Sequence, residues 1–247
     1  MYRVRKTWND PNSQIGAYTI LDNAIRVCDE NPGYSVFDED GTVVHKSKIP
    51  LIRTMSYKAK LKKKINSSHP SGQKVTVTID MNKNWVLDDG TLVPERSYLD
   101  LTKQIYDSNC RYSKADAEGW VNNNGFSSST PYLFWANKYG QRVYIFKGSK
   151  GNWVLHKVYT CGTGSIADGD GGDPGVGFKW KIYDKQRVFQ GPRSIQHYNM
   201  HYSSPHGNSI HKGTTGKPST HGCIALGPKG SVWAFENLPV NTRVILY

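Results

Sequence analysis

Residues 219–224 read STHGCI, and this short stretch carries the most specific chemistry of the 247-residue sequence. It places a thiol directly after a glycine and two residues after a histidine. A cysteine attacks as its thiolate, which needs a nearby base. Because glycine has no side chain, a substrate carbonyl can approach the backbone N–H groups of Gly222 and Cys223. The pattern predicts a nucleophile at Cys223 rather than a buried structural thiol.

Histidines that could serve as the base are concentrated just before this cysteine. Five of the eight histidines lie between residues 197 and 221: His197, His201, His206, His211 and His221. His211 follows alternating apolar and polar residues, as expected at the end of a strand. It is therefore the preferred base, with His206 and His201 as alternatives. His221 either takes part in the chemistry or fixes the turn before Cys223.

Two motifs together resemble the catalytic domain of the L,D-transpeptidases (YkuD type). One is Ile210-His211 with the glycine-rich segment after it, and the other is PSTHGCI at residues 218–224. The sequence LPVNTRVIL at residues 238–246 is also similar to the closing strand of that family. The resemblance covers residues 130–247 and implies a β-sandwich-like catalytic domain.

The resemblance also implies roles for individual residues. Cys223 is the expected nucleophile and His211 its base, and His221 and Gly222 complete the catalytic turn. Substrate contacts are expected from Thr220, Ser219 and Lys212. No metal and no cofactor is implied, and the four cysteines show no Cys-x-x-Cys spacing of a zinc site.

The activity implied by the resemblance is acyl transfer on peptidoglycan. A tetrapeptide stem is cut after its third residue, D-alanine leaves, and an acceptor amine forms a 3→3 cross-link. Water as the acceptor gives an L,D-carboxypeptidase instead. A non-catalytic wall-binding protein remains a further alternative, because the arginine common two residues after the cysteine is replaced by Ala225. Lys212, Lys217 and Arg193 are candidates for the missing positive charge.

Residues 1–48 predict a small α+β module. Apolar residues at 21, 24, 25 and 28 have helical spacing, and short strands are expected on either side. Residues 2–6 and 13–18 resemble a SPOR-like module of clostridial cell-wall amidases, which implies wall binding. The alternative is a packing appendage without a ligand.

Residues 49–103 predict a small β module. Residues 74–80 alternate with period two, and Asp88-Asp89-Gly90 predicts a hairpin turn. The pattern resembles a bacterial SH3-like barrel, with a simple spacer as the alternative. A connector is expected at 104–129, with a helix capped by Ser113. The catalytic domain at 130–247 shows almost no helical periodicity, so the whole chain is expected to be mainly β.

Charge and hydropathy fit a protein of the cell wall. The chain carries 32 Lys and Arg against 20 Asp and Glu, a formal net charge of +12, which predicts a polyanionic neighbour. Anionic wall polymers and peptidoglycan carboxylates are expected partners; no nucleic-acid-binding motif is present. No apolar run reaches the length of a membrane span, and the first residues lack a signal-peptide core. The expected extracellular location therefore requires a signal that has been removed or another export route.

Overall fold

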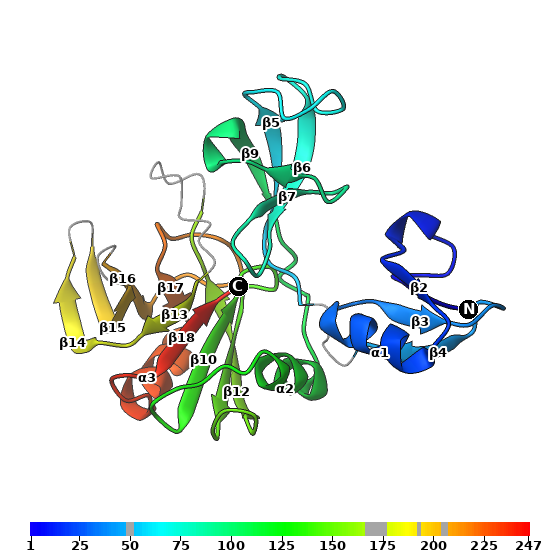
Figure 1. Cartoon of the computed structure of the whole chain (residues 1–247). Helices are drawn as coiled ribbons and strands as arrows, with labels where there is room; N and C mark the ends of the chain where they lie inside the picture. Colours follow the sequence, from blue (N-terminus) through cyan, green and yellow to red (C-terminus); the bar gives the residue numbers. More distant parts are fainter. Residues whose placement is uncertain (48–51, 166–176, 192–193, 204–206) are drawn as a thin grey trace. The chain divides into compact units, whose positions relative to one another are not determined.

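The computed structural model describes residues 1–47, 52–165, 177–191, 194–203 and 207–247. These residues form two compact units (Figure 1). The first contains Met1–Ile52, Tyr112–Phe126 and Lys150–Asn152, and the second contains Arg53–Arg111, Ser127–Ser149 and Trp153–Tyr247. Strand residues outnumber helical residues over the chain as a whole, so the prediction of a mainly β protein is confirmed. The glycine- and aspartate-rich segment 168–175, which the sequence suggests as a loop at the rim of the cleft, lies outside the described residues.

The first unit is built on a four-stranded antiparallel sheet in the order β2-β1-β3-β4. Helix α1 covers it with Ala24 and Cys28, which pack against Val4 and Val36. The predicted helix is confirmed and extends to Glu30. The elements are β1 Tyr2–Arg5, a 3₁₀ turn at Pro11–Ser13, β2 Gly16–Tyr18, α1 Leu21–Glu30, β3 Ser35–Phe37 and β4 Val43–Lys46.

Helix α2, Lys114–Asn123, belongs to the same unit and begins where the sequence predicts. The Ser113 side chain accepts a hydrogen bond from the backbone N–H of Asp116, and the Asp116 side chain bonds back to the Ser113 N–H. Such a capping box satisfies two N–H groups that the first helical turn leaves unpaired. Within the predicted connector 104–129, α2 accounts for ten residues, Lys114–Asn123.

The second unit contains a five-stranded antiparallel sheet in the order β8-β7-β6-β5-β9. Along β5, Tyr57, Ala59 and Leu61 are buried while Lys58 and Lys60 are exposed, as the period of two in a half-buried strand requires. The elements are β5 Ser56–Leu61, β6 Lys74–Ile79, β7 Trp85–Leu87, β8 Leu92–Val93, a 3₁₀ turn at Arg96–Tyr98 and β9 Leu99–Ile105. Strand β9 runs two residues past the predicted boundary at 103.

The same unit contains a nine-stranded sheet in the order β13-β18-β10-β11-β12-β17-β16-β15-β14. Its pairs are antiparallel except β10 with β18 and β16 with β17. The strands are β10 Tyr132–Asn137, β11 Arg142–Lys147, β12 Val154–Gly162, β13 Gly177–Lys181, β14 Asp184–Gln190, β15 Ile195–Ser203, β16 Asn208–Lys212, β17 Ile224–Leu226 and β18 Arg243–Leu246. The sequence predicts strands at residues 132–137 and 141–146 joined by a turn at 138–140, and β10 and β11 form this hairpin.

The large sheet is curled around one apolar core. Phe134 of β10 and Met200 of β15 belong to the same buried cluster. Five strand spacings separate these two strands in the sheet order, about 24 Å if the sheet were flat. Residues that far apart share a core only if the two halves of the sheet fold toward each other, which gives sandwich-like packing from a single sheet.

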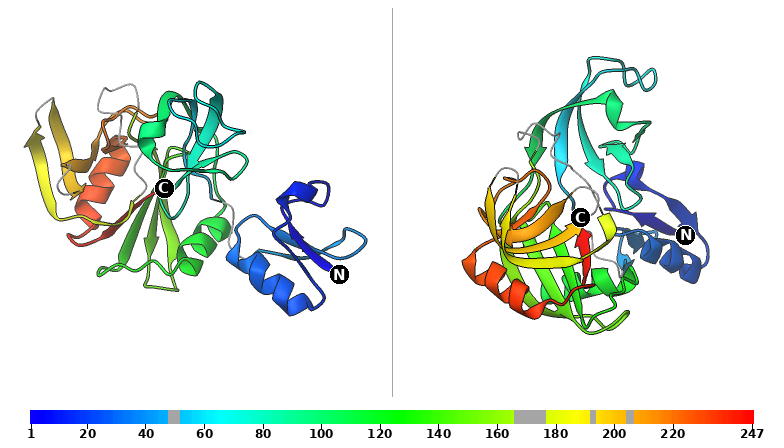
Figure 2. Two further views of the ribbon diagram at one scale, coloured as in Figure 1. Left: turned by 45° about the horizontal axis from the view of Figure 1, so that its top comes forward. Right: turned by 90° about the vertical axis from the view of Figure 1, so that its left-hand side faces the viewer.

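Helix α3, Pro228–Asn237, corrects the expectation of strands and loops alone in residues 130–247. It packs against β15, β16 and β17 (Figure 2), with Ala234 fully buried. Pro228 occupies the first turn, where its missing N–H costs nothing. Gly230 lies against the ring of Tyr159, so close approach rather than helix propensity places a glycine there.

Among the described residues, no helix combines the length and the apolar character that crossing a bilayer requires.

Removal of the α2 cap tests the stability of the first unit. We expect Ser113→Ala to lower the free energy of unfolding by about 1 kcal/mol, because the Asp116 N–H loses its acceptor. Hydrogen exchange of the α2 amides should report the loss locally. The exposed Ser68, replaced by Ala, is a matched control expected to change stability by less than about 0.5 kcal/mol. Unchanged exchange in α2 would contradict the assigned cap.

Candidate active site

The pairing of β16 with β17 brings the thiol next to the imidazole. These strands run parallel with Ile210 opposite Ile224 and His211 opposite Ala225. Cys223 is the residue just before β17, so it lies beside the segment from Ser209 to His211. A separation of twelve residues in sequence is thereby reduced to the spacing of neighbouring strands, about 4.8 Å.

His211 lies beside Cys223, and its other ring nitrogen is fixed. Each of the two side chains shifts the pKa of the other, and His211 Nδ1 lies 2.8 Å from the carbonyl oxygen of Lys212. A carbonyl oxygen only accepts hydrogen bonds, so Nδ1 carries a proton. In the neutral ring Nε2 is then the acceptor and is available to take the thiol proton.

The pKa shifts of the two groups favour an ion pair. Burial is the largest influence on the Cys223 thiol and acts to raise its pKa, but the hydrogen bond and charge of His211, with bonds from Ser209, outweigh it. The net result is a thiol pKa below the ordinary value. For His211, burial acts to lower the pKa, and the bond and charge of Cys223 with the Lys212 carbonyl raise it above the ordinary value. A thiolate next to an imidazolium accounts for both shifts, the lowered pKa of the thiol and the raised pKa of the imidazole.

Ser209 is a site residue that the sequence analysis missed. Its backbone N–H donates to Cys223 Sγ at 3.4 Å, and its hydroxyl oxygen lies 3.7 Å from the same sulfur. The signal was present: Ser209 and His211 are two residues apart on one strand, so their side chains share a face. Ser209 is fully buried, which keeps this contact away from water.

Two amide side chains of β15 hold the Ser209 hydroxyl. It donates to Gln196 Oε1 at 2.9 Å and accepts from Asn199 Nδ2 at 2.9 Å. Asn199 also donates to Gln196 Oε1 and is fully buried. The hydroxyl has only one proton, so it can donate to the sulfur only if it gives up its hydrogen bond to Gln196 Oε1. The network therefore positions the serine beside the thiol.

The turn that presents Cys223 requires glycine at position 222. Gly222 has a φ of +134°, and an added Cβ would lie 2.7 Å from the side-chain oxygen of Asn208. Tyr202 donates its hydroxyl to the carbonyl of Gly222 at 2.8 Å. Thr220 bonds the Cys223 carbonyl at 2.6 Å and accepts from the N–H of Gly222 at 3.3 Å. The turn is thus fixed from both sides before any substrate arrives.

The other residues suggested by the sequence lie in different surroundings. His221 and Lys212 are exposed, and Ser219 is half-buried with its hydroxyl 3.4 Å from the carbonyl of Thr214. The Thr220 hydroxyl, expected to contact substrate, is already engaged within the turn. A role of these four residues in binding or catalysis stays a prediction.

The alternative bases differ in their placement. Nδ1 of His201 lies 3.4 Å from the Asp184 carboxylate, and its ring contacts Phe189. These contacts place its ring against β14. His206, and Arg193 as a source of positive charge, lie outside the described residues.

Ala225 occupies the position where the resemblance leads one to expect an arginine. It is buried opposite His211 and Gly162. A Cβ added to Gly213 would lie 3.0 Å from the Ala225 methyl group, so the backbone after β16 passes directly over it. A long side chain at 225 would collide with that backbone. Any positive charge that anchors substrate must therefore come from another position.

Cys223 is chemically distinct from the two buried cysteines. Burial raises the pKa of Cys28 to about 11 and also raises the pKa of the fully buried Cys161. All four cysteines are free thiols. Among the described residues, no cluster of three or more His, Cys, Asp or Glu side chains has the arrangement of a metal site.

The pH dependence of Cys223 alkylation tests the pair. In a Cys110→Ser background, we expect the iodoacetamide rate, followed by intact mass, to rise with a midpoint below the ordinary cysteine pKa of about 8.5. His211→Ala leaves burial as the main influence and should move the midpoint above that value. Midpoints that coincide in the two proteins would refute an activating role for His211.

The turn is tested by Gly222→Ala. We expect alkylation of Cys223 at neutral pH to fall by about tenfold or more, because an alanine strains the backbone and displaces Asn208. Gly90→Ala is the matched control: its φ is +87°, but nothing lies within 4 Å of the added Cβ. It should cost about 1–2 kcal/mol of stability and leave the alkylation rate unchanged. Equal rates in both variants would contradict the assigned turn.

Comparison with known proteins identifies the family. Residues 36–246 match the family model of the L,D-transpeptidase catalytic domain, YkuD. Comparison with curated proteins gives no match.

Several solved structures are similar at low identity. The L,D-transpeptidase LdtMt1 in complex with imipenem is 16% identical with a TM-score of 0.41, and the match covers 47% of this chain and 59% of that one. An L,D-transpeptidase of Stackebrandtia nassauensis is 18% identical with a TM-score of 0.40, and the match covers 55% of this chain and 67% of that one. A fused Zn-dependent amidase/peptidase/peptidoglycan-binding protein of Clostridium acetobutylicum is 21% identical with a TM-score of 0.44. That match covers 66% of this chain and 75% of the other. The family model spans most of the sequence, and the chain belongs to the L,D-transpeptidase (YkuD) family.

Proposed function

We propose that the protein is a peptidoglycan L,D-transpeptidase that forms 3→3 cross-links through an acyl-enzyme on Cys223. The observation that carries the proposal is the placement of Cys223 beside His211 by the pairing of β16 with β17, with shifts of both pKa values toward the thiolate–imidazolium pair. Membership of the YkuD family supports the class of reaction. The donor substrate is a tetrapeptide stem.

The first half of the reaction forms a thioester. The Cys223 thiolate attacks the carbonyl carbon of the third stem residue, and the bond to the fourth residue breaks. His211 gives its proton to the departing amine, so D-alanine leaves as a neutral amine. The imidazole, still fixed by the Lys212 carbonyl, is then neutral and ready to act as a base.

The second half returns the enzyme to its starting state. An amine on the third residue of another stem attacks the thioester carbonyl, and His211 takes the proton that this amine loses. The new amide bond is the 3→3 cross-link, and the cysteine leaves as a thiolate. If water attacks instead, the same residues act as an L,D-carboxypeptidase, which is the second candidate function.

Backbone N–H groups near Cys223 are the candidate donors to the oxyanion. Such a donor is worth about 2.7–4 kcal/mol in the transition state. The N–H of Gly222 faces the Thr220 hydroxyl at 3.3 Å, a long bond that a developing oxyanion would have to replace. The burial of Gly222 favours this exchange, because charge interactions strengthen where water is excluded.

We further propose that the enzyme works outside the cell at the wall. Its net charge of +12 favours attachment to anionic wall polymers and peptidoglycan. The four-stranded sheet with α1 and the five-stranded sheet are proposed as the SPOR-like and SH3-like wall-binding modules. The third alternative, a wall-binding protein without catalysis, is disfavoured by the ordered Cys223–His211 pair.

The test starts with covalent labelling by a carbapenem. We expect intact mass spectrometry to show one imipenem adduct on the native protein and none on Cys223→Ala. His211→Ala should acylate at least about tenfold more slowly, because the thiolate fraction falls. Equal labelling of native protein and Cys223→Ala would rule out this cysteine as the nucleophile.

Product analysis separates the two reactions. With disaccharide-tetrapeptide as the substrate, both reactions release D-alanine; a transpeptidase also gives a cross-linked dimer, whereas a carboxypeptidase gives the disaccharide-tripeptide and no dimer. We expect the dimer, and loss of both products in Cys223→Ala. Imipenem labelling without any release of D-alanine would support Cys223 as the nucleophile but contradict the tetrapeptide stem as the substrate.

A further inference from the structure

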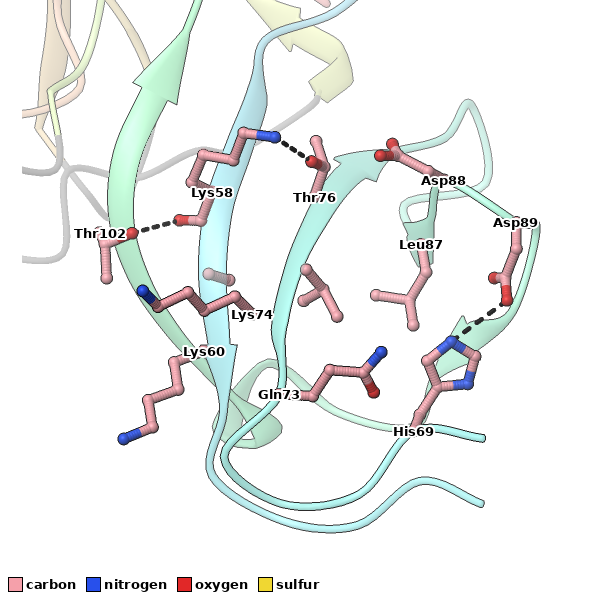
Figure 3. Close-up of a pocket in the computed structure, with 12 residues that line it drawn as sticks. Lys58, Lys60, His69, Gln73, Lys74, Thr76, Leu87, Asp88, Asp89 and Thr102 are labelled. Atoms are coloured by element: carbon pink, nitrogen blue, oxygen red, sulfur yellow. Dashed lines mark hydrogen bonds and ion pairs between the residues drawn. The ribbon is translucent and has the colours of Figure 1, made fainter. Parts of the chain in front are cut away.

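A pocket lies on the five-stranded sheet, apart from the Cys223 chemistry. Its volume is about 520 Å³, within the range of about 300–1,000 Å³ typical of small-ligand sites. The strands β5 and β6 form its floor and the β7–β8 turn forms one wall (Figure 3). Nothing in the proposed acyl transfer uses it.

Three lysines crowd one side of the pocket. Lys60 is directly opposite Lys74 in the antiparallel register of β5 and β6. Lys58 lies on the same face of β5, and its amine donates to Thr76 Oγ1 at 2.6 Å. Like charges directly opposite each other on a sheet are destabilising. Figure 3 shows the Lys60 and Lys74 amines on the side of β5 and β9, away from the turn. A ligand with carboxylates would relieve this repulsion.

The opposite wall is acidic. The Asp88 carboxylate is exposed at the β7–β8 turn, next to Asp89 (Figure 3). Asp89 is already engaged, because it contacts His69 Nε2 at 3.1 Å and accepts from the Thr91 N–H at 2.9 Å. Asp88 is thus the carboxylate available to an amine. The pocket presents three lysines on one side and two carboxylates on the other, and Asp89 is the one already held by His69 and Thr91.

A buried acceptor lies between the two sides. Gln73 lines the pocket, and its side-chain oxygen is buried without a hydrogen-bond partner. An unsatisfied buried acceptor costs about 1–3 kcal/mol, which a ligand N–H would recover. Val75 and Leu87 add apolar surface beside it. The occupant must therefore carry carboxylates, an amine, an N–H donor and an apolar part.

We propose that this pocket binds a short peptide that carries a free amine and at least two carboxylates. Lys58, Lys60 and Lys74 take the carboxylates, Asp88 takes the amine, and Gln73 accepts from a peptide N–H. A simple polyanion would be repelled by Asp88 and would leave Gln73 unpaired. The inference rests on the pocket alone and holds whether or not Cys223 transfers acyl groups.

The test is calorimetric titration of the full chain carrying Cys223→Ala, which keeps acylation out of the measurement. The probe is the tripeptide Ala-Glu-Ala with free ends, which has one amine and two carboxylates. We expect saturable binding that weakens with added salt. Replacing Lys60 and Lys74 together by Gln should weaken it by about tenfold or more. Gln73→Leu should also weaken it.

Matched controls isolate each contact. Lys64→Gln removes one charge from the same module outside the pocket and should leave affinity unchanged. Asp88→Asn should weaken Ala-Glu-Ala but not its N-acetylated form. Thermal unfolding checks the fold, and the Lys60/Lys74 double variant should be no less stable, because the repulsion is gone. No saturable binding, or equal affinity in the double variant and Lys64→Gln, overturns the proposal. Tighter binding of polyphosphate through the same lysines also overturns it, in favour of a polyanion site.

Discussion

The parallel pairing of β16 with β17 is the contact on which the candidate active site depends. It sets Cys223 beside Ser209 and His211, and no other element needs to move to complete the pair. Parallel neighbours require a crossover connection, which here is the segment from Gly213 to Gly222. Backbone bonds tie that segment to the end of β12: Gly216 N–H to the Cys161 carbonyl at 2.8 Å, and Ser219 N–H to the Thr163 carbonyl at 2.9 Å. The crossover is therefore fixed as firmly as the strands it joins.

Burial and hydrogen bonding act in opposite directions on the reactive pair. Burial disfavours charge on both Cys223 and His211, and hydrogen bonds between them, with Ser209 and the Lys212 carbonyl, outweigh it. Cys161, fully buried and without such a base, remains a thiol. The pKa values of Cys223 and Cys161 thus shift in opposite directions, because Cys223 has a histidine on the neighbouring strand.

Sequence reasoning succeeded where local pattern and tertiary structure agree. The alternation at residues 74–80 gave β6, and the Ser113 cap gave α2. It missed β5, in which Tyr57, Ala59 and Leu61 are buried and alternate with the exposed Lys58 and Lys60. It also failed for α3, whose glycine, serine and aromatic residues are weak helix formers. Packing of Ala234 into the core and of Gly230 on Tyr159 stabilises that helix instead.

The residues alone predict a nucleophilic cysteine, its preferred histidine and the glycine before that cysteine, because these are properties of a short motif. They do not reveal Ser209, Asn199 and Gln196 around the sulfur, since these come from strands whose register the sequence leaves open. They also leave the meaning of Ala225 open, whereas in the fold it lies under the backbone at Gly213. A short motif of consecutive residues specifies the local chemistry. The orientation of a proton donor depends instead on which strands become neighbours, and the burial of the shared core decides which strands pair.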